Sequence, residues 1–202
     1  MPKTVNEIQW PIDTARLSIR PVVPADADAM WAYRSLESVT TWMTTSAPDR
    51  NEFARYLAEP DRLAKTLVIE HDGTVIGDLM IAIEDAWAQT EVADQARGVQ
   101  AELGWCLSPE HVGHGYATEA VAELIRISFE ELGLRRVTAN CFAANEASWR
   151  LMERLGMRRE QHTVRESLHR SGVWHDGFGY ALLAEEWADA AAGRASVGQI
   201  AQ

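Results

Sequence analysis

The sequence has few cysteines, few lysines and no long apolar run. Its two cysteines, Cys106 and Cys141, are too few for a disulfide framework, and no group of Cys and His residues has the spacing of a zinc site. No apolar run approaches the roughly 20 residues of a membrane-spanning helix, and the first residues lack the charged and then apolar pattern of a signal peptide. We therefore expect a cytoplasmic protein without a metal site or a membrane contact.

Basic residues are scarce relative to acidic ones. The chain has 19 Lys and Arg residues against 30 Asp and Glu residues, which gives a formal net charge of −11, and only Lys3 and Lys65 are lysines. A nucleic-acid-binding protein needs a concentrated basic surface, so we expect no nucleic-acid partner. The charge suits a cationic or neutral partner, and solubility alone also explains it.

The composition is that of one soluble globular domain. Hydrophobic residues make up 47% and charged residues 24% of the 202 residues, and a chain of this length buries a core well. Residues 1–13 have no periodicity and are predicted to be an N-terminal arm. Residues 14–187 carry the periodic patterns of the domain, and the small and polar residues 188–202 predict a flexible tail.

Hydrophobic periodicity predicts seven strands and four helices in one α/β or α+β domain. Strands are expected at 14–22, 66–70, 74–81, 100–107, 135–142, 157–167 and 173–183, and helices at 24–36, from about 49, after 118 to 132 and at 145–156. Asp72-Gly73 lies between two apolar runs and predicts a hairpin turn, because both turn positions need a positive φ. Residues 84–99 have no strong pattern and are expected to be a long loop.

The segment Val112-Gly113-His114-Gly115-Tyr116-Ala117-Thr118 follows a predicted strand and precedes a predicted helix. Two glycines let the backbone approach a ligand, and the free N–H groups at a helix start favour an anion such as a phosphate. A simple tight turn would have the same pattern. The spacing excludes two other phosphate loops, because Thr118 occupies the third glycine position of a dinucleotide-binding fingerprint and no Gly-Lys-Ser/Thr follows.

Several motifs together resemble the GNAT superfamily of N-acetyltransferases, and within it the RimJ/RimL-like branch of ribosomal-protein acetyltransferases. The resemblance covers residues 14–187 and is carried by Glu102–Pro109, Val112–Ala120, Asn145–Ser148, Leu155–Met157, Trp174–Asp176 and Tyr180–Leu183. It implies the GNAT fold, a mixed and mostly antiparallel sheet of six to seven strands flanked by about four helices. It also implies acetyl-CoA as the co-substrate, while the absence of a third ligand with metal spacing near His111 and His114 predicts no metal.

The resemblance assigns the residues that bind the cofactor. The strand end is implied to offer backbone groups to the pantetheine arm, the loop to hold the pyrophosphate through its N–H groups, and Asn145 to contact the cofactor arm. The implied cofactor-binding residues are Trp105, Cys106, Leu107, Gly113, His114, Gly115, Tyr116, Ala117, Thr118 and Asn145. Asn145 is equally well explained as a helix N-cap. Val112 stands where the family usually has Gln or Arg, which predicts weaker binding through the surviving N–H group.

Acetyl transfer to an amine needs a neutral nitrogen and a proton for the leaving thiolate. The positions that hold a glutamate and a tyrosine in one branch of the superfamily are Asn140 and Met152 here, and neither can serve as base or acid. The resemblance places Ser148 near the cofactor sulfur, which makes it the candidate to protonate the thiolate. Glu102 is the candidate base through a water molecule, and a surface carboxylate or an ion-pair partner is the alternative interpretation.

The acceptor side is less well defined by the sequence. His162, Glu166 and His169 lie in the closing hairpin and are expected to be surface residues or acceptor contacts. Trp31, Trp42 and Trp174 are candidates to line the acceptor pocket. Cys106 and Cys141 are expected to be buried thiols on neighbouring strands.

The resulting hypothesis is an acetyl-CoA-dependent N-acetyltransferase that acts on a primary amine by direct attack in a ternary complex. The acceptor is expected to be a small-molecule or peptide amine, with a cationic one favoured by the net charge. The alternative is a non-catalytic acyl-CoA sensor of the same fold, and transfer of another acyl group is a third possibility. The edge of the closing hairpin also suggests a homodimer.

Overall fold

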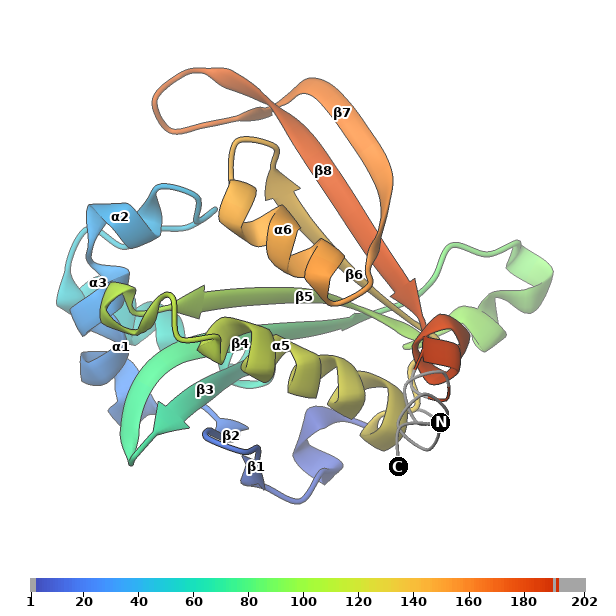
Figure 1. Ribbon diagram of the computed structural model, residues 1–202, viewed down its shortest axis with the longest axis horizontal. Helices are drawn as coiled ribbons and strands as arrows, with labels where there is room; N and C mark the ends of the chain where they lie inside the picture. The colour runs from blue at the N-terminus through green and yellow to red at the C-terminus, as the bar shows by residue number, and fades with distance from the viewer. Residues whose placement is uncertain (1–2, 191, 193–202) are drawn as a thin grey trace, which may run out of the picture.

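A computed structural model describes residues 3–190 and 192 of the chain. At its centre is a mixed sheet of eight strands in the spatial order β1-β2-β3-β4-β5-β6-β8-β7 (Figure 1). The strands are β1 (Ile12–Asp13), β2 (Ser18–Pro21), β3 (Thr66–His71), β4 (Thr74–Glu84), β5 (Gln100–Leu107), β6 (Arg136–Phe142), β7 (Arg158–Leu168) and β8 (Trp174–Leu183). Neighbouring strands are antiparallel except β5 and β6, which are parallel.

The α-helices flank this sheet. They are α1 (Ala27–Arg34), α2 (Glu37–Thr40), α3 (Arg50–Leu57), α4 (Pro60–Leu63), α5 (Tyr116–Arg126) and α6 (Glu146–Arg154). Short 3₁₀ segments are η1 (Val5–Glu7), η2 (Pro24–Asp26), η3 (Thr90–Ala96) and η4 (Pro109–His111), and the π-helical η5 (Ile127–Glu131) continues α5. Asp49 caps α3 by accepting hydrogen bonds from the N–H groups of Asn51 and Glu52.

The side chains of the central strands alternate between two hydrophobic clusters. Leu67 and Ile69 of β3 belong to the larger cluster with α5 and α6, and Val68 between them belongs to a second cluster with Met30 and Phe53. Helices α5 and α6 therefore cover one face of the sheet, and α1 and α3 cover the other. This alternation determines which side chains of β4 and β5 face which half of the site described below.

The predicted fold class is confirmed, with local differences. The Asp72-Gly73 turn has φ of 49° and 73°, as predicted for the β3–β4 hairpin. The sheet has an eighth strand because Ile12 of the predicted arm pairs with Ile19, and two residues are too few to show a periodicity. The loop 84–99 contains η3 (Thr90–Ala96).

The predicted tail begins within a helical segment, since residues 184–190 are helical. Residues 191 and 193–202 of that tail lie outside the described residues.

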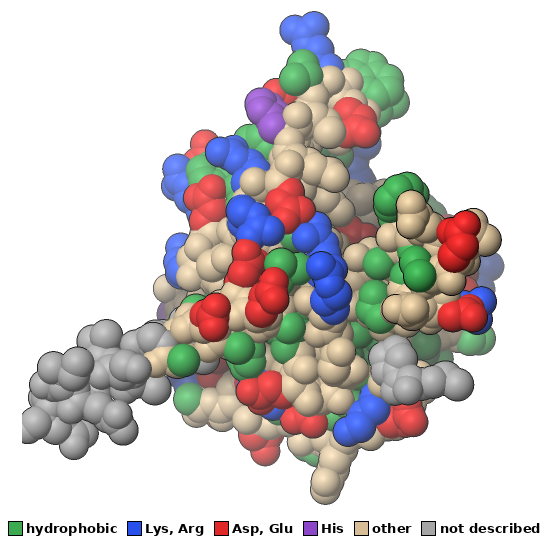
Figure 2. All heavy atoms as spheres, turned by 90° about the vertical axis from the view of Figure 1, so that its right-hand side faces the viewer, with side chains coloured by type: hydrophobic (Ala, Val, Ile, Leu, Met, Phe, Trp, Pro, Cys, Tyr) green, Lys and Arg blue, Asp and Glu red, His purple; other side chains and the backbone are tan. Residues whose placement is uncertain are grey.

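The surface and the sheet edge bear on possible partners. In the view of Figure 2, Lys and Arg side chains are interspersed with Asp and Glu side chains, and neither sign forms a continuous patch. Strand β7 lies at the sheet edge and exposes Val164 and Leu168, so the homodimer stays a prediction. Among the described residues, no helix is both long and apolar enough to cross a membrane.

Candidate active site

The site begins where β5 and β6 separate. The two strands pair only at Gln100–Glu102 and Arg136–Thr138, and beyond this point β5 continues beside β4 while β6 continues beside β8 (Figure 1). A cavity of about 1540 Å³ opens there. It is larger than a typical pocket for one small ligand, which suits a site for two substrates.

Beyond the paired segment, none of the described strands lies next to one edge of β5. The carbonyl groups of Val99 and Ala101 face β6, because they accept hydrogen bonds from Arg135 and Thr138, whereas the Ser108 N–H faces β4. Since backbone groups alternate between the two edges of a strand, those of Leu103, Trp105 and Leu107 point into the opening.

The backbone of Cys106, by the same alternation, faces β4, so of the three predicted strand-end contacts only Trp105 and Leu107 direct backbone groups to the opening. All three residues line the cavity. The thiol of Cys106 is buried, as predicted, whereas that of Cys141 is only half-buried.

The glycine loop lies at the start of α5 and lines the same cavity. Gly113 and Gly115 have φ of 88° and 82°, and Gly115 is the N-cap of α5. In the described residues, the N–H groups from Gly113 to Thr118 have no hydrogen-bond acceptor, whereas the Glu119 N–H binds the Gly115 carbonyl. This run of free N–H groups at a helix start is the chemistry that binds a phosphate or pyrophosphate.

The N–H group of Val112 is not available to a ligand, contrary to the prediction. Its N–H donates to the carbonyl of Pro109 over 3.3 Å, so this group is already engaged and does not replace the contact that the family's usual residue makes. His114 is exposed and stacks on the ring of Tyr116 with 5.7 Å between ring centroids.

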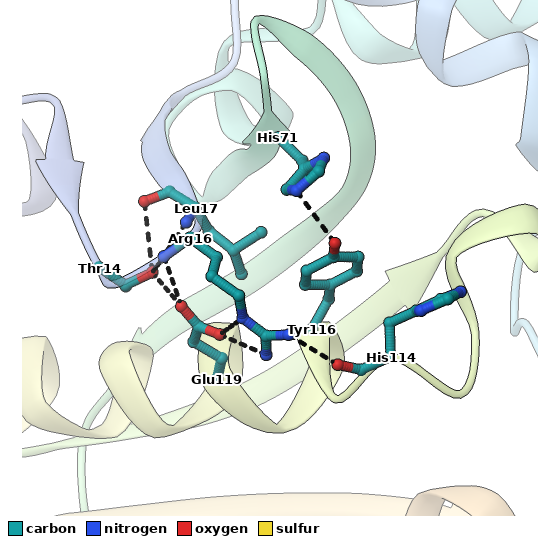
Figure 3. A network of polar contacts seen from close by, with 7 residues as sticks. All are labelled: Thr14, Arg16, Leu17, His71, His114, Tyr116 and Glu119. Carbon is teal, nitrogen blue, oxygen red and sulfur yellow. Dashed lines mark hydrogen bonds and ion pairs between the residues drawn. The ribbon is translucent and has the colours of Figure 1, made fainter.

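A polar network holds the loop from the side of β2 (Figure 3). The Arg16 guanidinium donates from Nη1 to the His114 carbonyl over 2.9 Å and from Nε to Glu119 Oε2 over 2.7 Å. Thr14 Oγ1 also donates to Glu119, over 2.6 Å. Burial alone would raise the pKa of Glu119, but the hydrogen bonds from Thr14 and Arg16 outweigh it and lower that pKa.

Tyr116 ties the same loop to β3. Its hydroxyl lies 2.9 Å from Nε2 of His71, and the Arg16 guanidinium lies over its ring, 4.6 Å from the centroid. Arg16 and His71 are not predictable from the sequence, because each lies far from the loop in sequence and no local pattern marks it.

Asn145 and Ser148 stand at the start of α6 and line the cavity. The Asn145 side chain accepts a hydrogen bond from the Ser148 N–H over 3.4 Å, so its capping role is confirmed. Burial raises the pKa of the Cys141 thiol to about 11, although a hydrogen bond from Ser148 acts in the opposite direction. The Ser148 hydroxyl therefore lies beside a protonated thiol in the cavity wall.

Glu102 lies where the two strands separate. Its Oε1 accepts a hydrogen bond from Nδ2 of Asn140 over 3.1 Å, across the gap between β5 and β6. Asn140 thus orients the Glu102 carboxylate. Position 140 is the one at which the resemblance implies a glutamate in one branch of the superfamily. Met152, the second altered position, is buried and cannot reach a substrate.

Aromatic contacts join the cavity wall to the closing hairpin, where the sequence predicts the acceptor pocket. Trp42 lines the cavity and packs against His169 and His175 of the closing hairpin, with ring centroids 5.4 and 6.0 Å apart. His169 Nε2 donates to the Thr41 carbonyl over 2.8 Å. Of the three candidate tryptophans, only Trp42 lines this cavity.

The other candidates on this side lie elsewhere. Trp31 packs on Phe53 in the second hydrophobic cluster, and Trp174 is exposed on the hairpin. His162 pairs with Asp176 on the hairpin surface, and Glu166 is exposed there.

Comparison with known proteins gives the family. The model of the acetyltransferase (GNAT) domain matches residues 16–158. The chain belongs to the GNAT acetyltransferase family. It is 33% identical over 150 residues to YdaF of Bacillus subtilis, named as a candidate ribosomal N-acetyltransferase, and this match covers 74% of the chain and 73% of the relative. It is 37% identical to the uncharacterized N-acetyltransferase YnaD of B. subtilis over 86 residues, 43% of the chain and half of the relative's length.

Solved structures of GNAT proteins have the same fold. An acetyltransferase of Bacillus anthracis superposes with a TM-score of 0.74 at 27% identity and covers 88% of this chain and 100% of its own. RimL, an L7/L12 α-N-protein acetyltransferase in complex with coenzyme A, superposes with a TM-score of 0.73 at 17% identity, with 86% of this chain and 97% of RimL covered. The second likeness shows a shared fold.

Proposed function

We propose that this GNAT protein transfers the acetyl group of acetyl-CoA to a primary amine by direct attack in a ternary complex. The run of free N–H groups from Gly113 to Thr118, opening onto a cavity that also holds Glu102, carries this proposal. The loop fits a pyrophosphate, and the open edge of β5 offers N–H and C=O groups along which the pantetheine arm can lie. The relatives named as ribosomal N-acetyltransferases support a protein or peptide amine as the acceptor.

The chain's own residues supply the proton transfers. An alkyl ammonium has a pKa near 10.4 and must lose a proton before its nitrogen can attack a carbonyl. Glu102, oriented by Asn140, accepts that proton through water. A backbone N–H on the open edge of β5 stabilises the oxyanion that forms at the thioester carbonyl. When the C–S bond breaks, Ser148 donates a proton to the thiolate and the amide product remains.

A direct transfer is favoured over an acetyl-cysteine route by the state of the thiols. Burial raises the pKa of Cys106 to about 12, and the charge of Asp78 acts in the same direction. The pKa of Cys141 is also raised, to about 11. Both thiols are thus protonated at neutral pH, and the protonated form is a poor nucleophile.

The test is release of coenzyme A thiol from acetyl-CoA across a panel of amines, with the N-acetyl product identified by mass spectrometry. We expect thiol release that depends on both the amine and the enzyme. Tight binding of acetyl-CoA with no product from any amine would contradict transfer and favour the acyl-CoA sensor instead. The same assay with succinyl-CoA determines which acyl group is preferred.

A further inference from the structure

The part of the cavity proposed to bind the acceptor contains more unpaired cations than unpaired carboxylates. We call this part the acceptor wall and define it by five residues that line the cavity: Arg34, Trp42, Tyr56, Arg62 and Lys65. Arg34, Tyr56 and Arg62 belong to α1, α3 and α4, whereas Trp42 and Lys65 lie in the loops before α3 and before β3. The helices that carry Arg34 and Tyr56, α1 and α3, cover the sheet face opposite the one covered by α5. The acetyl-CoA loop at the start of α5 is therefore separate from the acceptor wall.

Two of the three described carboxylates that line the cavity are not free to bind a cation. Asp78 is only 2% exposed and accepts hydrogen bonds from the Tyr33 hydroxyl and from Arg34 Nε, both over 2.8 Å, and from Arg34 Nη2. Glu119 is held by Arg16 and Thr14. Of the described acidic residues that line the cavity, this leaves Glu102, which the proposed reaction needs as the base.

The cations of the acceptor wall are largely uncompensated. In the described residues, neither Arg62 nor Lys65 has an ion pair or a side-chain hydrogen bond, and both are half-buried. The Arg62 guanidinium lies over the Tyr56 ring, 4.3 Å from its centroid, so its position is set by stacking. Arg34 is tied to Asp78 through Nε and Nη2, which leaves its Nη1 without a partner in the described chain.

The cations on the acetyl-CoA side have partners of their own. Arg16 pairs with Glu119 and Arg150 pairs with Glu146. Arg154 donates only to the neutral Thr118 hydroxyl, but it is exposed to solvent, unlike the half-buried Arg62 and Lys65. This difference between the two groups of cations indicates that Arg62 and Lys65 can bind an anion that the described chain does not provide. A half-buried guanidinium or ammonium gains most from a carboxylate that it can bind through hydrogen bonds.

We propose that the acceptor amine carries a carboxylate, which binds Arg62 and Lys65 while the amine faces Glu102. This inference rests on the proposed function and specifies its substrate class. It reverses the expectation of a cationic acceptor, because the net charge of −11 belongs to the whole surface whereas recognition depends on the charges that line the site. A polycationic acceptor would meet a single available carboxylate and several cations.

The test uses acceptors that differ in one group. Three amidated tripeptides are compared, Ala-Glu-Ala, Ala-Gln-Ala and Ala-Lys-Ala with the lysine side-chain amine trimethylated, so that all share the N-terminal amine as their one acceptor group and differ in the charge of one side chain. Glutamic acid α-amide and glutamine α-amide form the matching small-molecule pair, so the two arms distinguish a peptide from a free metabolite as the source of the carboxylate. We expect kcat/KM about tenfold higher for the Glu acceptor than for the Gln acceptor, and lowest for the Lys acceptor.

Variants connect this preference to the two cations. Arg62→Gln and Lys65→Gln should each raise KM for the Glu acceptor about tenfold and leave the Gln acceptor and the KM for acetyl-CoA unchanged. Lys65→Glu should shift the preference toward the Lys peptide. Arg55→Gln is the matched control, because Arg55 is exposed on α3 and does not line the cavity.

The outcomes separate this inference from the proposed function. No product from any amine would contradict the proposed function itself. Efficient transfer with equal or better use of the Gln and Lys acceptors would overturn the inference and leave the function intact. A higher KM for acetyl-CoA in Arg62→Gln or Lys65→Gln would also overturn it, because these cations would then serve the phosphates of the cofactor.

Discussion

The Arg16 guanidinium joins the glycine loop to the first turn of α5 by donating to the His114 carbonyl and to the Glu119 carboxylate, over 2.9 and 2.7 Å. His114 precedes the N-cap of α5, and Glu119 lies in the first turn of that helix. The Arg16 side chain, from the segment before β2, therefore holds the carbonyl of His114, a residue that does not line the cavity. With this carbonyl bound by Arg16, the free N–H groups that follow it remain available to an anion.

Replacing Arg16 tests this role. We expect Arg16→Gln to raise the Kd for acetyl-CoA about tenfold, because the loop loses its charge-assisted hydrogen bonds to the His114 carbonyl and the Glu119 carboxylate. Isothermal titration calorimetry measures the change. Arg97→Gln is the control, since Arg97 is an exposed residue that pairs with Asp94 outside the site. An unchanged Kd in Arg16→Gln would show that the loop keeps its shape without this contact.

Glu102 is predicted to affect the chemical step and not the binding of acetyl-CoA. We expect Glu102→Gln to lower kcat at least about a hundredfold, because general-base catalysis contributes that much or more, with the Kd for acetyl-CoA unchanged. Steady-state kinetics and calorimetry separate the two effects. Glu84→Gln, an exposed carboxylate at the end of β4, serves as the control. A kcat within about threefold of the wild-type value would remove Glu102 from the mechanism.

The thiols are predicted to react slowly at neutral pH. The pKa values of Cys106 and Cys141 are raised to about 12 and about 11, mainly by burial. At pH values below its pKa each thiol stays protonated, and the protonated form reacts poorly with iodoacetamide. Alkylation should therefore be slow at pH 8 and accelerate toward pH 11, first at the half-buried Cys141. Peptide mass spectrometry follows each residue separately.

The direct mechanism also predicts that Cys141→Ala stays active. A stable acetyl-Cys141 adduct after incubation with acetyl-CoA, together with an inactive Cys141→Ala variant that still folds, would contradict direct transfer to the amine.

The sequence predicts the parts of the molecule that depend on short-range signals. The Asp72-Gly73 hairpin, the N-cap at Asn145 and the glycine loop each follow from the conformational needs of neighbouring residues. The strand Ile12–Asp13 is not predictable from the sequence, because it is stabilised by pairing with β2 and not by a pattern of its own. Its existence depends on a partner that only the folded chain brings near.

The difference between short-range signals and contacts formed only in the folded chain also explains which parts of the site the sequence does not predict. Arg16 and Glu119 are 103 residues apart, and Tyr33 and Asp78 are 45 apart, so no local spacing links them. The separation of β5 from β6 also depends on where pairing stops, which one strand's sequence does not determine. The charge of the acceptor wall follows from that tertiary arrangement and differs from the net charge of the chain.

The central claim is that the loop from Gly113 to Thr118 binds the pyrophosphate of acetyl-CoA, and calorimetric titration of two matched glycine variants tests it most directly. Gly115 and Gly133 have similar positive φ values of 82° and 69°, but only Gly115 lies in the loop, where an added Cβ would also lie 3.4 Å from Arg16 Nη2. Alanine at either position should cost a similar stability of roughly 1 kcal/mol.

We expect the wild-type protein and Gly133→Ala to bind acetyl-CoA alike and Gly115→Ala to bind at least about tenfold more weakly, because its loop N–H groups are displaced. Absence of binding by the wild-type protein, or equal binding by a folded Gly115→Ala variant, would contradict the account.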